Sequence, residues 1–313
     1  RHDPRSKPGW SWSGERWWPR TVHSKLFYKD SVFADKLKVT NEAFPRYVPS
    51  ARVHTFHRFL PYEVFYDKHP EYYALRNGKR LPTQLCLTNT DVLKIVKDSV
   101  NSFFNKSPNS DVISVSQDDN TQYCQCDKCS KIDNHEGSPA GTMIHFVNAV
   151  AESFPNKTIS TLAYQYTRKP PKVKPIENVL ITLCSIECNR SVPIELGCKD
   201  FSSDLKGWSQ LTDNIRIWDY TTQFTNFLAP FPNWGTIKPN INLFVDNNAK
   251  WIFEQHSNND SELFELRSYI MAKLLWNPNL DFQTLLNEFN NKYYGNGGKY
   301  ISEYVNSIQI MLQ

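Results

Sequence analysis

The sequence has no run of about 18 to 20 apolar residues, so it contains no candidate transmembrane helix. It also lacks a run of lysines or arginines, and its formal net charge of +4 is spread along 313 residues. Nucleic acid is therefore not an expected partner. There is no internal repeat and no low-complexity linker. Neither an initiating Met nor a signal peptide precedes Arg1, and we expect a fragment or a processed form.

Aromatic residues, by contrast, are abundant. They make up 14% of the chain and include nine tryptophans, whereas apolar residues at 40% and charged residues at 22% are close to globular averages. This composition argues against disorder. The aromatic surplus either fills a core or lines a sugar-binding cleft, where flat rings cover the apolar C–H faces of pyranosides.

From about residue 25 onwards, short β-rich runs alternate with longer helical stretches, which is typical of parallel βαβ units. The expected strands are Lys25 to Tyr28, Arg52 to Phe56, Gln84 to Leu87, Val112 to Val115, Ile159 to Tyr164, Val179 to Leu183, Ile215 to Trp218 and Lys250 to Phe253. Apolar residues recur with helical spacing in Val92 to Phe104, Thr142 to Phe154 and Leu263 to Leu275.

This alternation predicts an α/β fold, namely a (β/α)8 TIM-type barrel over residues 25–313 that follows an irregular Trp-rich segment, 1–24. A doubly wound open sheet would give the same local pattern. Polar side chains at the strand ends favour the barrel, because these ends converge on one mouth, where its active sites lie. The candidate substrate-binding residues there are His54, His57, Asn89, Tyr164, Tyr166, Trp218, Asp219, Tyr220 and Glu254.

Two adjacent carboxylates, Asp118 and Asp119, directly follow the apolar run that begins at Val112. Placing charges there costs stability unless they are satisfied or used. Glycoside cleavage would use them, since one acid protonates the leaving oxygen and another supports positive charge at the anomeric carbon. The alternative is structural: one aspartate caps the following segment and the other accepts hydrogen bonds from backbone amides.

The cysteines number seven, so at least one is free, bound to metal or paired outside the chain. Three of them, Cys124, Cys126 and Cys129, follow the acid pair closely and suit a structural zinc better than disulfides. A fourth ligand, a distant Cys or His, is not apparent. Reduced or partly disulfide-bonded cysteines are the alternative, and a catalytic metal is disfavoured because no His-Glu-x-x-His motif is present.

Further acids stand at other strand ends. Glu187 and Glu254 each end an apolar run, and either is a candidate second catalytic or substrate-binding acid, unless it only pairs with a nearby Arg or Lys. The triplet Trp218-Asp219-Tyr220 can stack on a sugar and bind its hydroxyls, or can be ordinary packing. His54 and His57 are either substrate-facing or buried hydrogen-bonding groups.

Several motifs in a fixed order resemble glycoside hydrolase family 163, a Bacteroidetes-rich family formerly known as a domain of unknown function. The resemblance runs from about Phe27 to Gly295. Its motifs are His54-Thr-Phe, the run from His69 to Arg80, Gln84-Leu-Cys-Leu-Thr-Asn89, Ser116-Gln-Asp-Asp-Asn120 with the cysteine cluster, Trp218-Asp-Tyr220, Leu274-Leu-Trp-Asn-Pro278 and Tyr293-Tyr-Gly295.

The resemblance implies an endo-β-N-acetylglucosaminidase that cuts the chitobiose core of complex N-glycans, with no cofactor required for catalysis. It further implies a substrate-assisted retaining mechanism, in which Asp118 orients the 2-acetamido group and Asp119 transfers the proton, with Glu187 as the competing acid. Secretion, or a periplasmic or cell-surface location, is implied as well. Family members carry a further domain before the barrel, which this chain replaces with its Trp-rich stretch.

Two other functional classes stay open. One is a noncatalytic barrel that binds glycans through its aromatic cleft, and the other is a zinc-dependent hydrolase centred on the cysteine cluster. Turnover of an N-glycan separates the first from an enzyme. Metal removal distinguishes a zinc-dependent hydrolase from a protein with a structural zinc, because loss of a structural zinc affects stability more than turnover.

Overall fold

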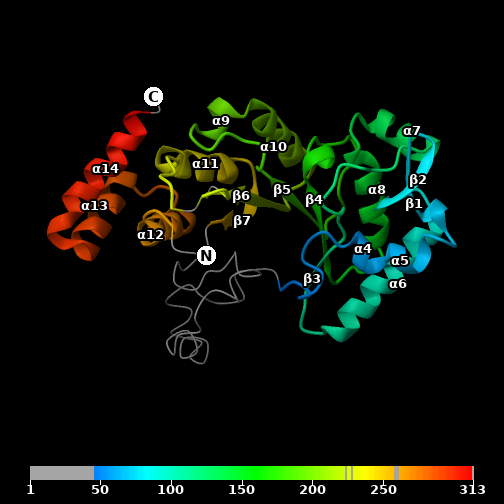
Figure 1. Cartoon of the computed structure of the whole chain (residues 1–313). Coiled ribbons are helices and arrows are strands. Elements are labelled where there is room, and N and C mark those ends of the chain that lie inside the picture. Colours follow the sequence, from blue (N-terminus) through cyan, green and yellow to red (C-terminus); the bar gives the residue numbers. More distant parts are fainter. Residues whose placement is uncertain (1–45, 223, 227, 257–260, 312–313) are drawn as a thin grey trace. The chain divides into compact units, whose positions relative to one another are not determined.

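The computed structural model describes residues 46–222, 224–226, 228–256 and 261–311 (Figure 1). The expected strand Lys25 to Tyr28 and the Trp-rich segment lie outside these residues. The fold is α/β, and the chain divides into two compact units. The first comprises Pro45–Cys184 and Asp204–Arg216. The second comprises, among the described residues, Ser185–Ser203 and the chain from Ile217 onwards.

One sheet contains five strands, and their order in the sheet is their order in the sequence. They are β3 (Val112–Ser114), β4 (Thr158–Ala163), β5 (Val179–Cys184), β6 (Ile215–Tyr220) and β7 (Ala249–Gln255). The pairs β3–β4 and β4–β5 are parallel. All six residues of β5 are buried, as expected for a strand covered on both faces. The five strands expected in these regions are confirmed.

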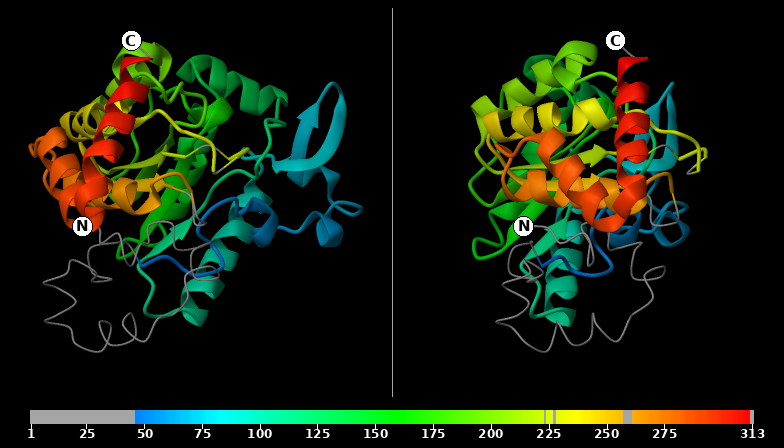
Figure 2. Two further views of the ribbon diagram at one scale, coloured as in Figure 1. Left: turned by 60° about the vertical axis from the view of Figure 1, so that its left-hand side comes forward. Right: turned by 90° about the vertical axis from the view of Figure 1, so that its left-hand side faces the viewer.

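In the first unit, the helices α6 (Thr90–Lys106) and α8 (Ala140–Ala151) confirm two of the expected helices. Valines at every fourth position from Val92 to Val100 bury one face of α6, and α8 packs against β4 and β5 (Figure 2). Shorter elements of this unit are α4 (Phe56–Phe59), α5 (Tyr62–Phe65), η3 (Pro70–Tyr72), α7 (Asp127–Glu136) and η4 (Gln165–Thr167).

The expected strand from Arg52 to Phe56 is wrong. His54 has φ of 51°, in the left-handed region, which breaks an extended chain, and the segment continues into the short helix α4. From residue 46 to this segment, a single bridge pairs the chain with the sheet, between Tyr47 and Val112. Thr55 and Phe56 of this segment are buried in the core without forming a ladder.

The expected parallel strand from Gln84 to Leu87 is also wrong. Gln84 and Leu85 end β2 (Lys79–Leu85), which pairs antiparallel with β1 (Tyr73–Arg76) in a separate two-stranded sheet. The turn between them is Asn77-Gly78, and both residues have positive φ, at 48° and 74°. This dipeptide favours a two-residue hairpin turn, so the sequence carried the signal.

The second unit is mainly helical. Its long helices are α11 (Trp234–Asp246), α12 (Phe264–Trp276), α13 (Phe282–Tyr293) and α14 (Gly298–Ile310). Buried residues of all four form one apolar cluster around Ile237, Ile270, Leu286 and Val305, and α12 confirms the third expected helix. The shorter elements are α9 (Ile194–Gly197) and η5 (Gly295–Gly297), while α10 (Lys199–Leu211) runs through both units. Across the described ranges, no helix has both the length and the apolarity to span a membrane.

Candidate active site

The acid loop, residues 116–120, follows the end of β3 and is held in place by hydrogen bonds of its buried residue Gln117. Gln117 is only 1% exposed, and its amide donates to Thr167 Oγ1 at 2.8 Å and to the Tyr164 carbonyl at 3.2 Å. The Gln117 carbonyl accepts from His54 Nδ1 at 2.7 Å. These bonds join the loop to the ends of neighbouring segments, so the direction of the two aspartates is fixed by buried contacts.

A second glutamine, Gln84 at the end of β2, holds the loop from the other side. Its Nε2 donates to the carbonyls of Asp118 at 2.7 Å and Asn120 at 3.0 Å, and its Oε1 accepts from Asp118 N at 3.1 Å. Asn120 Nδ2 in turn donates to the carbonyl of Thr83 at 3.0 Å. Sequence reasoning missed this role of Gln84.

The two aspartates lie in different surroundings. Asp118 is half-buried and its Oδ1 accepts from the backbone amide of His57 at 3.3 Å. Burial raises the pKa of Asp118, and this amide and the nearby His57 and His54 only partly offset the effect. Asp119 is exposed, and its Oδ1 accepts from the Tyr164 hydroxyl at 3.1 Å. Neither aspartate caps a helix, because α7 begins at Asp127 with Cys126 as its N-cap.

His54, His57 and Tyr164 thus stand beside the acid pair. The ring of His54 lies 6.1 Å from that of Tyr164, and His57 Nε2 lies 3.6 Å from Glu63 Oε1. Nδ1 of His57 is buried without a hydrogen-bond partner. An acid pair, two imidazoles and a phenol are therefore gathered around one loop of the first unit.

Two other expected binding residues of this unit have evident structural contacts. The side chain of Asn89 caps α6, because its Oδ1 accepts from Asp91 N at 2.9 Å and Val92 N at 3.2 Å. Tyr166 is half-buried and stacks on Tyr123, with ring centroids 4.7 Å apart. No contact in the first unit connects Asn89 with the acid pair.

A second acid pair lies in the second unit, where Asp219 on β6 and Glu254 on β7 are 6% and 5% exposed. The two carboxyl groups lie close enough to affect each other's ionisation. Burial raises the pKa of both, and for Glu254 the charge of Asp219 raises it further. Asp219 also accepts from the hydroxyl of Ser185, while Glu254 Oε2 is buried without a partner. The pair therefore retains a proton more readily than free carboxyl groups.

These two acids line a small pocket of the second unit. Ser185, Arg190, Asn233 and Asn240 supply further polar groups to its wall. Arg190 donates to the carbonyls of Tyr220 and Ile186, at 2.9 and 3.0 Å, so its guanidinium is held by backbone. The sequence predicted Asp219 and Glu254 as site residues but missed Ser185 and Arg190.

The remaining predicted residues of this unit divide between packing and solvent. Trp218 and Tyr220 are nearly buried and stack at 6.3 Å, and the Trp218 indole donates to Gln255 Oε1 at 2.8 Å. Packing therefore accounts for most of their surface. Glu187 is exposed in the turn after β5, near Arg190, and does not belong to the buried pair.

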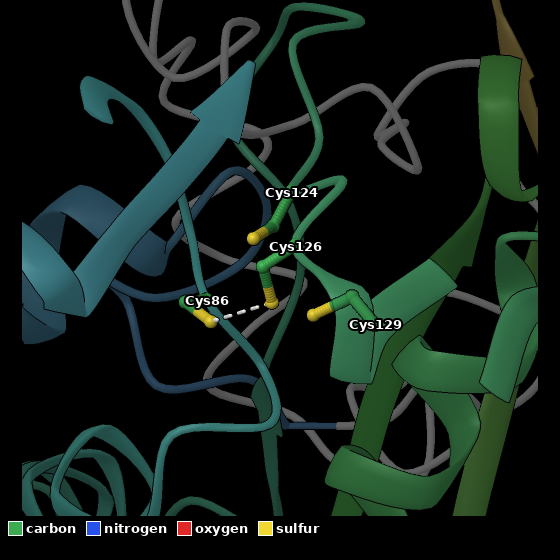
Figure 3. A group of neighbouring side chains, drawn as sticks. All are labelled: Cys86, Cys124, Cys126 and Cys129. Atoms are coloured by element: carbon green, nitrogen blue, oxygen red, sulfur yellow. Dashed lines mark hydrogen bonds between the residues drawn. The ribbon is translucent and has the colours of Figure 1, made fainter. Parts of the chain in front are cut away.

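The cysteine cluster gains a fourth member in the structure. Cys86, which directly follows β2, joins Cys124, Cys126 and Cys129, and all four Sγ atoms lie within 4.8 Å of one another (Figure 3). Two of the other cysteines, Cys188 and Cys198, form a disulfide, and Cys184 is a separate buried thiol. Sequence reasoning missed Cys86 because a hairpin brings it from far away along the chain.

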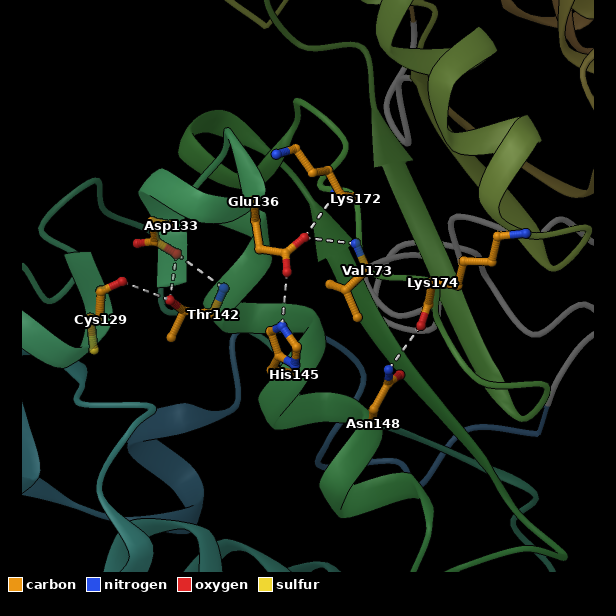
Figure 4. A network of polar contacts seen from close by, with 9 residues as sticks. All are labelled: Cys129, Asp133, Glu136, Thr142, His145, Asn148, Lys172, Val173 and Lys174. Carbon is orange, nitrogen blue, oxygen red and sulfur yellow. Dashed lines mark hydrogen bonds and ion pairs between the residues drawn. The ribbon is translucent and has the colours of Figure 1, made fainter. Parts of the chain in front are cut away.

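The helix that carries Cys129 is fixed to α8 by buried polar contacts (Figure 4). Thr142 donates to the Cys129 carbonyl at 3.3 Å, and Glu136 accepts from His145 Nε2 at 3.1 Å and Val173 N at 2.7 Å. Burial alone would raise the pKa of Glu136, but these hydrogen bonds outweigh it and the pKa lies below its usual value. A side chain at Gly141 would clash with Glu136, so this corner requires glycine.

The described chain is thus an α/β protein with one acid cluster in each unit. A family model described as a domain of unknown function, DUF4838, matches residues 16–306. Because the match covers most of the chain, the protein belongs to the DUF4838 family. No curated protein matches the chain significantly.

Proposed function

We propose that the protein is a glycoside hydrolase that cleaves β-N-acetylglucosaminide linkages, endo-acting on the chitobiose core of complex N-glycans. The observation that carries the proposal is the contrast between adjacent aspartates, Asp118 with a raised pKa and Asp119 exposed beside the Tyr164 phenol. Acid pairs whose surroundings differ in this way can divide proton donation from charge stabilisation. The motifs shared with glycoside hydrolase family 163 supply the substrate class.

In a substrate-assisted reaction the 2-acetamido oxygen attacks the anomeric carbon, the glycosidic bond breaks, and the leaving oxygen takes a proton. The family resemblance implied Asp118 for orienting the acetamide and Asp119 for proton transfer, with Glu187 as the competing acid. The surroundings favour the reverse. Burial raises the pKa of Asp118, which suits a proton donor, while the exposed Asp119 carboxylate can accept the acetamide N–H. The attack of the acetamido oxygen leaves an oxazoline ring on the sugar. Water then adds to the anomeric carbon and opens this ring, and Asp118 takes a proton from the water.

The five-stranded sheet supports the finer fold proposal, a (β/α)8 barrel. Its strands follow one another in sequence order, whereas a doubly wound sheet reverses its order at a switch point. The acids follow β3 and lie on β6 and β7, towards the strand ends where barrel enzymes place their catalytic groups. The disulfide Cys188–Cys198 supports the proposed secreted, periplasmic or cell-surface location, because disulfides persist in oxidising compartments.

The test is incubation with a biantennary N-glycoprotein, followed by mass analysis of the released sugar and the remaining protein. We expect a glycan that ends in one GlcNAc, with the other GlcNAc left on asparagine. Asp119→Asn should reduce the rate of release by about 10² to 10⁴ while the melting temperature is kept, and the exposed Asp98→Asn on α6 serves as the control. Glycan binding without turnover would instead establish the noncatalytic alternative.

The third alternative, a zinc-dependent hydrolase, finds less support in the cysteine cluster. Catalytic zinc sites keep one coordination position open for water, and their protein ligands number three. The cluster here brings four thiols together, which would fill a tetrahedral shell. Hydrolysis that persists after complete metal removal would exclude this alternative.

A further inference from the structure

We propose that Cys86, Cys124, Cys126 and Cys129 bind a structural zinc ion, with Cys86 as the ligand that closes the site. Cys86 Sγ and Cys126 Sγ are 3.7 Å apart, and all four sulfurs lie within 4.8 Å of one another. Tetrahedral zinc with Zn–S bonds of about 2.3 Å needs sulfurs about 3.8 Å apart, whereas a disulfide needs about 2.0 Å. The spacing therefore matches shared metal ligation better than a sulfur–sulfur bond.

The surroundings of the sulfurs suit thiolates. The amide of Leu75 donates to Cys124 Sγ at 3.3 Å, and Thr88 Oγ1 lies 3.3 Å from Cys129 Sγ. Arg80 Nη1 approaches Cys124 Sγ at 4.0 Å. Four thiolates and one Zn²⁺ carry a net charge of −2, and donors and a cation around the sulfurs offset such a charge. These groups would orient and stabilise the ligands of the bound ion.

A bound ion would also stabilise the hairpin formed by β1 and β2. The buried cluster on its cysteine side consists of Ala74, Cys86, Cys124 and Cys129, with Leu75 and Cys126 packed against it, and contains no aromatic residue. A two-stranded hairpin is marginally stable by itself, and small elements with little apolar core commonly rely on a metal. Zinc would link the end of β2 to the start of α7, where Cys126 is the N-cap.

The ion would also hold in place the two segments that flank Asp118 to Asn120 of the acid loop. Gln84, which holds the loop through three hydrogen bonds, is two residues before Cys86, and Cys124 follows the loop closely. Zinc is thus expected to act on stability and on the placement of the loop, without contacting substrate. The inference does not depend on the proposed glycosidase activity.

The first experiment measures the metal content of the full chain after expression with zinc. We expect about one zinc per chain in the wild type, a loss of most of it in Cys86→Ser, and no change in Cys184→Ser. Cys184 is the matched control because it is a buried cysteine outside the cluster. Substitution with Co²⁺ should give the visible absorption of a tetrahedral thiolate site in the wild type and in Cys184→Ser.

The second experiment uses the wild-type chain, so it holds even where Cys86→Ser fails to fold. Stripping zinc with a chelator should lower the melting temperature by about 10 °C or more, and adding zinc back should restore it. Wild-type protein without bound metal, or with the four thiols paired as disulfides by mass analysis, would overturn the proposal. So would full zinc retention in Cys86→Ser, or metal removal without any change in stability.

Discussion

The two acid pairs of this protein are built in opposite ways. Asp118 and Asp119 are neighbours in sequence but lie in different surroundings, one half-buried and the other exposed. Asp219 and Glu254 come from two different strands, yet both are buried, affect each other's ionisation and have raised pKa values. The first arrangement separates the tasks of two acids, and the second lets two acids share a proton. Proximity along the chain therefore predicts neither similar surroundings nor a similar task.

The largest effect is expected on the turnover of N-glycan by variants of the acid loop. Asp118→Asn and Asp119→Asn should each reduce kcat by about 10² to 10⁴, because each removes a group that acts in the transition state. Steady-state assays across pH would show which is the proton donor. The basic limb of the wild-type profile, which reports the protonated donor, should disappear from the residual activity of Asp118→Asn and persist in Asp119→Asn.

The next effect concerns the disulfide beside the second pair. Cys188 lines the same pocket as Asp219, and Cys188–Cys198 closes a short loop. Replacing both cysteines by serine should cost about 2 to 3 kcal/mol of unfolding free energy, measured by urea denaturation. If the acid loop performs the chemistry, kcat should change less than threefold or so, since the loop belongs to the other unit. A collapse of kcat in folded protein would transfer the chemistry to the second pair.

Glu254→Gln tests whether the pair Asp219 and Glu254 acts in catalysis or only in substrate binding. The amide replaces a protonated carboxyl and can still donate to Asp219, so the fold should be kept and kcat should be nearly unchanged, while KM rises up to about tenfold. A loss of kcat as large as that of Asp119→Asn would contradict the division of tasks between the pairs.

The same variant has a signature in the dependence of stability on pH. The folded pKa of Glu254 lies above its unfolded value, so the native state binds more protons and wild-type stability falls as pH rises from about 4 towards the folded pKa. Glu254→Gln should remove this contribution and be more stable than wild type at neutral pH, by about 1 kcal/mol. Equal slopes of stability against pH in both proteins would show that the pair does not retain a proton.

The smallest effect is that of Asp118→Asn on stability. Because burial raises the pKa of Asp118, the ionised side chain destabilises the fold at neutral pH, and the cost disappears as pH falls through the folded pKa. The variant should therefore be as stable as wild type at pH 7 or more so, by no more than about 1 kcal/mol in thermal unfolding. Inactivity together with unchanged stability would identify a residue kept for function. A marked loss of stability would instead assign Asp118 a structural role.

Periodicity predicted some of the elements and left out others, among them the amphipathic helices α10, α13 and α14. Five strands of the sheet and the helices α6, α8 and α12 follow from apolar runs and from helical spacing. The two strands that were wrong fail for local reasons. At His54 the backbone adopts positive φ, and at Asn77-Gly78 a tight turn makes an antiparallel hairpin instead of a parallel strand. The first cannot be recognised from residue type, whereas the second could have been.

Local sequence pattern also identified only some of the residues of the candidate site. The strand-end rule identified Asp118, Asp119, Asp219 and Glu254, because carboxylates that follow apolar runs stand out in a sequence. It could not identify Gln84, Ser185 or Cys86, whose importance comes from contacts with residues far away along the chain.

What the sequence by itself determined is thus the α/β alternation, the acids at the strand ends and three of the four clustered cysteines, since local pattern encodes each of these. Tertiary structure alone decided which cysteine completes the cluster, which aspartate is buried, and that Asp219 meets Glu254. The physical reason is that burial and nearby charges set the pKa of a carboxyl group, and that the approach of other sulfurs decides whether a cysteine joins the cluster. Both depend on segments that only folding brings together.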